Sequence, residues 1–466
     1  LQIDRVNMGC RFEHYLLTRD VKVLEEMKEL MRGWAHGYIE YALDFAAAGL
    51  YEEALSLLEC HVTGTTEIYP VVYYAMGYFH TCKGDESKAL EYYQRAEKEN
   101  HSYCFPNRIE EVLILQDALR LNIHGAKAAY SLGNFWYANR QYDNAIEHSA
   151  AINPAYPTVW RNLSLAYYNK RDDKQKALET LEKAYALDEH DSRILMELDQ
   201  LYKRLGRPHS ERLAFLEAHL PEVEQRDDLS IERITLYNQS GRYAEAKELI
   251  AARNFHPWEG GEGKITGQYV LCRVELAKIA LSEKRYADAL VLLDETDAYP
   301  FNLGEGKLAN AEENDIWYYK GEAFRGLGNE QQAIDCFTKA TIGSSEPQQA
   351  FFYNDQQPDK IFYQGLAWRA LGREDKARSC FNKLIKHGEK HLFDHCRIDY
   401  FAVSLPDLAI WEDDLDKRNC IHCNYVMGLG YLGLREMGKA IDFLDKVREL
   451  DINHQGGQIH RNLCAV

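Results

Sequence analysis

Two short glycine-rich segments carry the sequence features that most resemble a ligand site. Gly261–Lys264 and Gly304–Lys307 both read Gly-Glu-Gly-Lys, within the longer segments WEGGEGK and NLGEGK. Glycine-rich loops can cradle phosphate, but a phosphate loop follows a strand, and this chain shows no strand pattern. Alternating glycines also form turns where backbone and ligand approach closely, with Glu262 and Glu305 as acceptors. We favour a simpler interpretation, in which both loops cap their helices, because loop glycines mostly serve turns.

The loops around these two segments are rich in aromatic residues. Aromatic rings beside carboxylates and amides suit a sugar or a peptide, since the rings cover apolar faces while polar groups recognise hydroxyls. Packing beneath the long loops, or against another region of a longer protein, explains the same rings. The candidate binding residues on this loop edge are Trp258, Glu259, Glu262, Phe301, Asn302 and Glu305.

The segment CIHC (420–423) is the sequence's best match to a metal site. Cys420, His422 and Cys423 have ligand chemistry, but zinc normally needs four ligands from two spaced pairs, and a second CxxC is absent. The acidic run EDDLD (412–416) lacks the glycine of a calcium loop. No Ser-His-Asp order, HExxH motif or nucleophile elbow occurs. We therefore expect no metal, no cofactor and no catalytic residue, and the sequence predicts a protein that is not an enzyme.

The overall composition argues against several classes of partner. The chain has 466 residues, with 55 Lys and Arg against 73 Asp and Glu, and a net charge of −18. This acidic balance disfavours binding to nucleic acid or to an anionic membrane surface. No apolar stretch approaches the ~20 residues needed to span a bilayer, and no signal-peptide pattern is present. The eleven irregularly spaced cysteines resemble reduced thiols, which favours a cytoplasmic protein.

A repeated pattern indicates which elements position these residues. A small alanine recurs in the second helix of each unit, and glycines often precede it by twelve and by five residues. Four residues after the alanine stands a large apolar side chain, such as Phe337 or Phe381. Small residues let two helices cross closely, and the later glycine suits a left-handed helix end. The alanines are Ala54, Ala89, Ala145, Ala177, Ala246, Ala289, Ala333, Ala377 and Ala440.

This pattern resembles the tetratricopeptide repeat over nearly the whole chain. The resemblance implies an all-α fold, an α-α superhelix of about nine to ten helical hairpins, in which each unit must stack on its neighbours to bury its apolar face. The units near 73–101, 317–343 and 361–387 match most strongly. The unit near 195–220 matches weakly, because Glu211 stands where the alanine is expected.

Departures from the repeat divide the predicted solenoid into two regions. Residues 1–253 form repeats with an extra helix near 109–119, and residues 254–466 form repeats with long inserted loops on one edge. The unit at Ala145 is short, which indicates either a deletion or residues missing near 145–149, and we favour the second reading. The opening LQID resembles segments that follow second helices, so we expect residue 1 to lie inside a longer protein.

The concave face of the solenoid is the second candidate binding surface. In tetratricopeptide proteins the second, fifth, ninth and twelfth positions of a unit line this groove, and the resemblance assigns those positions mainly to Tyr and Arg, which make good recognition anchors. Tyr130 stands where chaperone-binding members have Lys, so chaperone-tail binding is disfavoured. The candidate concave-face residues are Tyr74, Tyr78, Tyr130, Asn134, Tyr137, Arg161, Tyr168, Tyr318, Glu322, Arg325, Arg369 and Tyr425.

A non-enzymatic protein–protein interaction scaffold is the function that the sequence favours, because a solenoid offers an extended surface and no enclosed cavity. The second half, through RNFHPWEGGEGK, AYPFNLGEGK and DYFAVSLPDLAIWEDDLDKRN, also resembles the C-terminal repeats of large uncharacterised bacterial proteins. The N-terminal β-rich domain of those proteins looks carbohydrate-active. That resemblance implies a missing N-terminal domain as the partner. It also supports an alternative, an accessory region of a carbohydrate-active enzyme that contributes loop residues to a sugar site.

Overall fold

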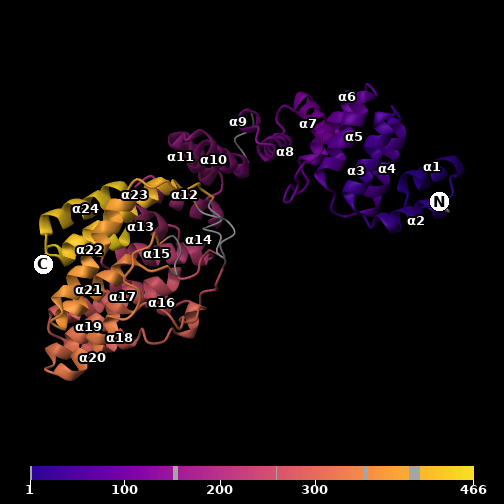
Figure 1. Ribbon diagram of the computed structural model, residues 1–466. Helices are drawn as coiled ribbons and strands as arrows, with labels where there is room; N and C mark the ends of the chain where they lie inside the picture. Colours follow the sequence, from indigo (N-terminus) through magenta and orange to yellow (C-terminus); the bar gives the residue numbers. More distant parts are fainter. Residues whose placement is uncertain (1–2, 151–155, 259, 351–354, 398–409, 466) are drawn as a thin grey trace. The chain divides into compact units, whose positions relative to one another are not determined.

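Helices make up the regular structure of the chain. The computed structural model describes residues 3–150, 156–258, 260–350, 355–397 and 410–465, and within these ranges it contains α-helices, one 3-10 helix and no strand (Figure 1). The predicted all-α fold of helical hairpins is thereby confirmed. Over the same ranges, no helix combines the length and the apolar character needed to cross a membrane.

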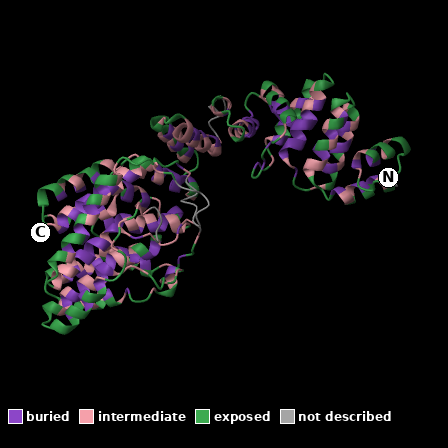
Figure 2. Ribbon diagram, viewed as in Figure 1, coloured by how far each residue is buried: buried purple, intermediate pink, exposed green. Residues whose placement is uncertain are grey.

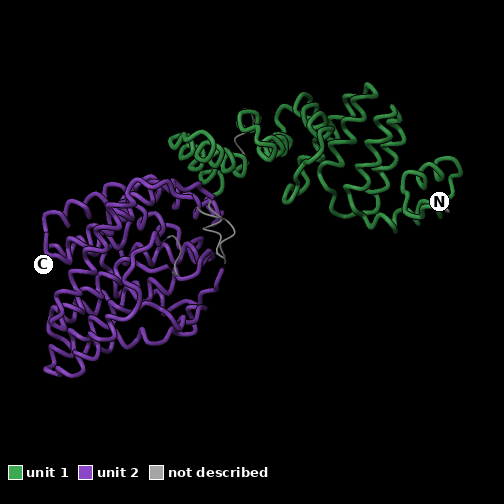
Figure 3. The backbone as a smooth tube through the Cα atoms, in the orientation of Figure 1, with its two compact units in different colours: residues 1–188 green, residues 189–466 purple. Residues whose placement is uncertain are grey.

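The chain separates into two compact units, residues 1–188 (unit 1) and 189–466 (unit 2), which are coloured separately in Figure 3. Unit 1 stacks the antiparallel hairpins α3/α4, α5/α6, α8/α9 and α10/α11 behind the pair α1/α2. An additional helix, α7, packs against both α5 and α8. The helices are α1 (Met8–Thr18), α2 (Val21–Met31), α3 (Ala35–Ala47), α4 (Tyr51–Gly64), α5 (Pro70–Cys82), α6 (Glu86–Ala96), α7 (Ile109–Leu121), α8 (Ala126–Ala138), α9 (Tyr142–Ala150), α10 (Pro157–Arg171) and α11 (Lys174–Leu187).

Unit 2 begins with three irregular helices and continues as the hairpins α15/α16, α17/α18, α19/α20, α21/α22 and α23/α24, followed by α25. Its helices are α12 (Ser192–Arg204), α13 (His209–Glu217), α14 (Leu220–Val223), α15 (Asp227–Gln239), α16 (Tyr243–Ala251), α17 (Lys264–Ser282), α18 (Tyr286–Asp294), η1 (Phe301–Leu303), α19 (Asn314–Gly326), α20 (Glu330–Ala340), α21 (Pro358–Ala370), α22 (Glu374–His391), α23 (Leu415–Gly433), α24 (Met437–Leu450) and α25 (Gln455–Leu463). The division at residue 254 that loop length suggests stays a prediction.

The recurring alanines lie in the core of every hairpin. Ala145 is 4% exposed, and the other eight anchor alanines are fully buried. Figure 2 shows buried residues in purple along the helices of both units. The glycine twelve residues earlier faces the large side chain four residues after the alanine. A Cβ at Gly321 would lie 2.5 Å from the ring of Phe337, and one at Gly365 would lie 2.4 Å from Phe381. The two helices of a hairpin therefore cross at a distance that only small residues permit.

The turn between the two helices of a hairpin has one conformation throughout. The residue five before each anchor alanine has positive φ in all nine hairpins. Five of these residues are the glycines expected from the sequence, and four are not glycine: Arg140, Asp172, Lys284 and Arg435. The left-handed helix end is thus a property of the hairpin, and glycine is its least strained solution.

Candidate protein-binding surfaces

Five of the expected concave-face residues form a strip in unit 1, hereafter the unit 1 strip. Tyr130, Asn134 and Tyr137 lie at helical spacing on one face of α8, and Arg161 and Tyr168 do so on α10. All five side chains are half-buried, so each one packs partly against the chain and has an exposed part that is available to a partner.

Contacts between α8 and α10 fix the geometry of the unit 1 strip. The ring of Tyr130 meets that of Tyr156 edge-on, with centroids 5.5 Å apart. Asn162 donates from Nδ2 to Asn134 Oδ1 at 3.1 Å, and its own Oδ1 accepts from Arg161 Nη1 at 3.1 Å. Asn134 Nδ2 has no hydrogen-bond partner within the described ranges. That nitrogen is buried, so the exposed chemistry of the strip consists of aromatic edges and a guanidinium, which suit recognition of a peptide. Sequence reasoning missed Asn162 and Tyr156.

The two expected residues on α5 have different surroundings. Tyr74 is fully buried and donates its hydroxyl to Glu97 Oε1 at 2.7 Å. Glu97 in turn accepts from the backbone N–H groups of Lys127 and Ala128 at the start of α8, both at 3.0 Å. Burial and the Glu97 carboxylate raise the pKa of Tyr74 well above its usual range. Tyr74 therefore serves the junction between α6 and α8, whereas Tyr78 is half-buried beside Phe79.

In unit 2 the expected concave-face residues contact the chain itself. The ring of Tyr318 packs edge-on against that of Tyr319 and at a tilt against that of Tyr363, with centroids 5.3 Å and 5.8 Å apart. Arg325 pairs with Glu322 one turn earlier on α19, and burial raises the pKa of that carboxyl.

Arg369 on α21 binds Glu374 through two hydrogen bonds of 2.8 Å and 2.9 Å and donates to the carbonyl of Gly433 at 2.8 Å. It therefore links α21, α22 and α23. Tyr425 on α23 is only 6% exposed and lies against the rings of His454 and His460, with centroids 4.7 Å and 5.7 Å apart. Both histidines belong to the end of the chain.

Residues 451–463, hereafter the C-terminal segment, lie against α15, α17, α21 and α23, on the face of unit 2 that the repeat pattern predicts to be concave. His460 of α25 is buried between Phe362 and Tyr363 of α21 and Tyr425 of α23, with ring centroids 5.5–6.0 Å away. Asn453, just before α25, is 6% exposed. The segment therefore reaches helices far earlier in the sequence than its neighbour α24.

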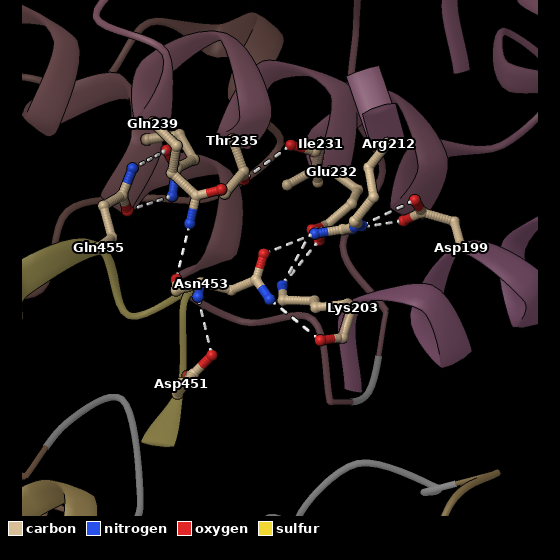
Figure 4. A network of polar contacts seen from close by, with 11 residues as sticks. Asp199, Lys203, Arg212, Ile231, Glu232, Thr235, Gln239, Asp451, Asn453 and Gln455 are labelled. Atoms are coloured by element: carbon tan, nitrogen blue, oxygen red, sulfur yellow. Dashed lines mark hydrogen bonds and ion pairs between the residues drawn. The ribbon is translucent and has the colours of Figure 1, made fainter. Parts of the chain in front are cut away.

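Asn453 joins a buried ionic network at the start of unit 2 (Figure 4). Its Oδ1 accepts from Arg212 Nη1 at 3.1 Å, its Nδ2 donates to the carbonyl of Lys203 at 3.0 Å, and its own carbonyl accepts from Gln239 Nε2 at 2.7 Å. Arg212 is fully buried and binds both Asp199 Oδ2, at 2.6 Å, and Glu232 Oε1, at 2.7 Å.

Opposing effects set the charge state of this network. Burial raises the pKa of Glu232, but Lys203 and Arg212 outweigh burial and lower it to about 2, so the carboxylate stays ionised. The network forms at the weakest repeat unit, where Glu211 replaces the small alanine and Arg212 enters the core. That irregularity is the one sequence signal that could have pointed to it.

The two Gly-Glu-Gly-Lys loops lie together on one side of unit 2. Glu305 Oε2 accepts from the N–H of Gly263 at 2.9 Å, which links the second loop to the first at the start of α17. Burial raises the pKa of Glu305, with Glu262 adding to the effect. Glu262 accepts from the N–H of Gly260 within its own loop at 2.9 Å. The carboxylates of this loop edge thus bind loop backbone.

The remaining loop-edge residues also differ in their environment. Asn302 donates to the carbonyls of Ile250 and Arg253 at 2.7 Å and 2.8 Å, and so caps the end of α16. Trp258 covers Gly261 so closely that a Cβ there would lie 2.1 Å from the indole ring. Phe301 is fully exposed, and Glu259 lies outside the described residues. Of the predicted loop-edge set, the structure therefore brings Glu262 and Glu305 together and leaves Phe301 apart.

The cysteine and histidine residues of CIHC lie on α23. Cys423 is buried, and His422 Nε2 lies 2.8 Å from the carbonyl of Gln348. Burial lowers the pKa of His422 to about 4. Within the described ranges, no three His, Cys, Asp or Glu side chains are grouped so that they could hold a metal ion.

Comparison with known proteins identifies the repeat type locally. Residues 361–387, which cover most of α21 and α22, match the family described as tetratricopeptide repeat. Among solved structures, the chain is similar to MamA from Desulfovibrio magneticus RS-1, at 22% identity and a TM-score of 0.24, over 41% of this chain and 97% of that one. It is similar to pilF of Pseudomonas aeruginosa at 16% identity and a TM-score of 0.27, over 47% and 89%. The P58(IPK) TPR domain is similar at 15% identity and a TM-score of 0.24, over 80% and 100%.

Proposed function

We propose that this chain is a non-enzymatic interaction scaffold that binds an extended peptide segment of a partner protein along the unit 1 strip. The observation that carries the proposal is the partial exposure of Tyr130, Asn134, Tyr137, Arg161 and Tyr168 on two adjacent helices. A stack of helical hairpins offers such a surface along its length.

The chemistry of the strip supports a peptide as its ligand. Tyrosine presents a large ring at low conformational cost, because it has only two side-chain torsions. The guanidinium of Arg161 suits a backbone carbonyl or a carboxylate of the peptide. Partners of this kind include a separate protein and the N-terminal region of a longer polypeptide containing this chain. All eleven cysteines are unpaired thiols, which supports the cytoplasm as the location.

The alternative, a sugar site on the loop edge, has less support. A sugar site needs polar groups that converge on the ligand, whereas Glu262 and Glu305 bind loop backbone and Asn302 caps the end of α16. Phe301 is exposed, but the other aromatic candidate, Trp258, packs on its own loop.

A peptide library displayed on phage and selected on the full chain tests the proposal. We expect selected peptides to bind at least about tenfold more weakly to Tyr137→Ala and to Arg161→Ala, as for anchors at protein interfaces. Tyr103→Ala is the matched control, because Tyr103 is exposed in unit 1 but lies outside the strip. Selected peptides that bind all three variants equally would contradict the proposal. A glycan array probed with the same chain, with binding lost in Trp258→Ala, would instead support the loop edge.

A further inference from the structure

Polar contacts contribute to holding the C-terminal segment against unit 2, beside the ring contacts of His460. Within α25 only Gly457 and His460 are buried, whereas α23 buries a long apolar series. Gln268 Nε2 donates to Gln455 Oε1 at 3.1 Å, and Gln458 Nε2 donates to the carbonyl of Gln239 at 2.8 Å. The apolar contacts of α25 are mainly those of the His460 ring and Leu463, so the hydrophobic effect holds α25 less strongly than it holds α23.

The hydrogen bonding of this interface is incomplete. Three buried polar atoms, Asn238 Oδ1, Gln239 Oε1 and His460 Nε2, have no hydrogen-bond partner among the described residues. Their residues are only 2%, 4% and 3% exposed. Buried polar atoms in native proteins are nearly always paired, so each exception calls for an explanation. Here the concave face offers two acceptors that its own segment leaves unused.

Helix α25 is also a poor helix by itself. It has nine residues and contains Gly456 and Gly457 in its first turn, and isolated helices shorter than about 12 residues are marginal in water. The glycines are needed where they stand, because a Cβ at Gly456 would lie 2.6 Å from Tyr425 Oη and one at Gly457 would lie 2.8 Å from Val447. The helix therefore depends on the surface that it covers.

We propose that the concave face of unit 2 is a second peptide site, which the C-terminal segment closes in cis and a partner's helix opens by replacing it. The segment itself defines the partner: a short helix preceded by an asparagine turn, with a ring that enters between Phe362, Tyr363 and Tyr425. Added donors facing Asn238 and Gln239 give the partner its advantage over the segment. This surface differs from the unit 1 strip, so the inference does not depend on the proposed function.

A fluorescein-labelled peptide of residues 450–465, titrated into the full chain, tests the inference. The double variant Asn453→Ala, Gln458→Ala loses side-chain hydrogen bonds that hold the C-terminal segment against unit 2. We expect this variant to bind the peptide at least about tenfold more tightly than the natural chain does. Asn462→Ala is the matched control, since Asn462 lies exposed on the same helix. We expect it to bind as the natural chain does.

Hydrogen exchange on the unmodified chain gives a second readout that needs no variant. The amides of α25 should exchange at least about tenfold faster than those of α23, because opening of the segment is a local event. Equal exchange of α25 and α23 would overturn the inference, as would a folded double variant that gains no affinity for the peptide. A double variant that forms a stable dimer and excludes the peptide would assign the site to a second copy of the chain, and so would overturn the partner assignment.

Discussion

Units 1 and 2 build concave faces from the same hairpin, yet they surround the aromatic residues of these faces differently. In unit 1, Tyr130 on α8 stays half-buried, while in unit 2 Tyr425 on α23, at the same position of its repeat, is 6% exposed beneath the C-terminal segment. The same repeat position is therefore available surface on α8 and interior on α23. Position within a repeat defines which face a residue occupies, and the rest of the chain decides whether that face is open.

The largest expected effect comes from a substitution in the buried ionic network of unit 2. Arg212→Met leaves Asp199 and Glu232 without their shared cation, and removing one partner of a buried pair costs about 3–5 kcal/mol. We expect the free energy of unfolding of unit 2 to fall by that amount and that of unit 1 to stay unchanged. The measurement is urea unfolding, with pulsed hydrogen exchange to follow the two units separately. Arg448→Met, in an exposed pair with Asp445, is the control and should cost less than about 1 kcal/mol. An equal loss in the two variants would contradict this role for Arg212.

Acid should loosen the C-terminal segment of unit 2. Burial lowers the pKa of His460 from 6.5 to about 3, so the closed form holds the neutral imidazole. The stability gained is complete above pH 6.5 and is lost progressively as the pH falls toward 3. Near pH 5 the loss is about 2 kcal/mol, at about 1.4 kcal/mol for each pH unit below 6.5. The measurement of this loss is hydrogen exchange of the α25 amides at pH 7.5 and at pH 5, corrected for the intrinsic exchange rates.

The groups around His460 define the control for that measurement. The titratable groups that face it are Tyr425, Tyr363, His454, Lys278 and Asp315. His460→Gln removes the titrating imidazole from this site and keeps a polar side chain. The difference between the two pH values should shrink by at least half in this variant. An unchanged difference would point to another of these groups.

The variant Tyr74→Phe should lower the stability of unit 1 without changing its binding of peptides. Tyr74→Phe removes the hydrogen bond to Glu97 and should cost about 1 kcal/mol of stability. Binding of strip-selected peptides should not change, because the side chain is buried. The measurement is urea unfolding beside a peptide titration, with Tyr103→Phe as the exposed control. A stable Tyr74→Phe variant with weakened peptide binding would place Tyr74 in the recognition surface.

Glycine substitutions at the left-handed helix ends should have the same effect on stability in both units, and this effect is the smallest of those predicted. Arg140 in unit 1 and Lys284 in unit 2 have φ of 59° and 60°, where glycine is less strained. Arg140→Gly and Lys284→Gly should each stabilise their unit by about 0.5–1 kcal/mol in urea unfolding. Arg207→Gly, just beyond Gly206, is a control that should not stabilise. A destabilising effect in only one unit would show that the two units do not share the turn.

The sequence predicted the hairpins because their signals are local. An alanine, a glycine twelve residues earlier and an apolar residue four later all act within one hairpin, as the contact of Gly321 with Phe337 shows. The same local signal failed at Arg140 and Lys284, where backbone geometry outweighs residue preference.

Closure of the concave face could not be predicted in that way. The bond between Arg212 and Asn453 joins residues 241 apart in sequence, and the one between Gln239 and Asn453 joins residues 214 apart. Such contacts depend on how curvature accumulates over many stacked hairpins, which no single repeat specifies. The assignment of Tyr425 to a binding face followed from its repeat position alone, and its contact with His454 and His460 depends on this closure.

Nitration of tyrosines in the folded chain, mapped by mass spectrometry, tests the contrast between the units most directly. The account predicts that Tyr137 and Tyr168 react readily while Tyr363 and Tyr425 are protected. It also predicts that Tyr425 gains reactivity when Asn453→Ala and Gln458→Ala loosen the C-terminal segment. Equal reactivity of Tyr137 and Tyr425 in the natural chain would contradict it.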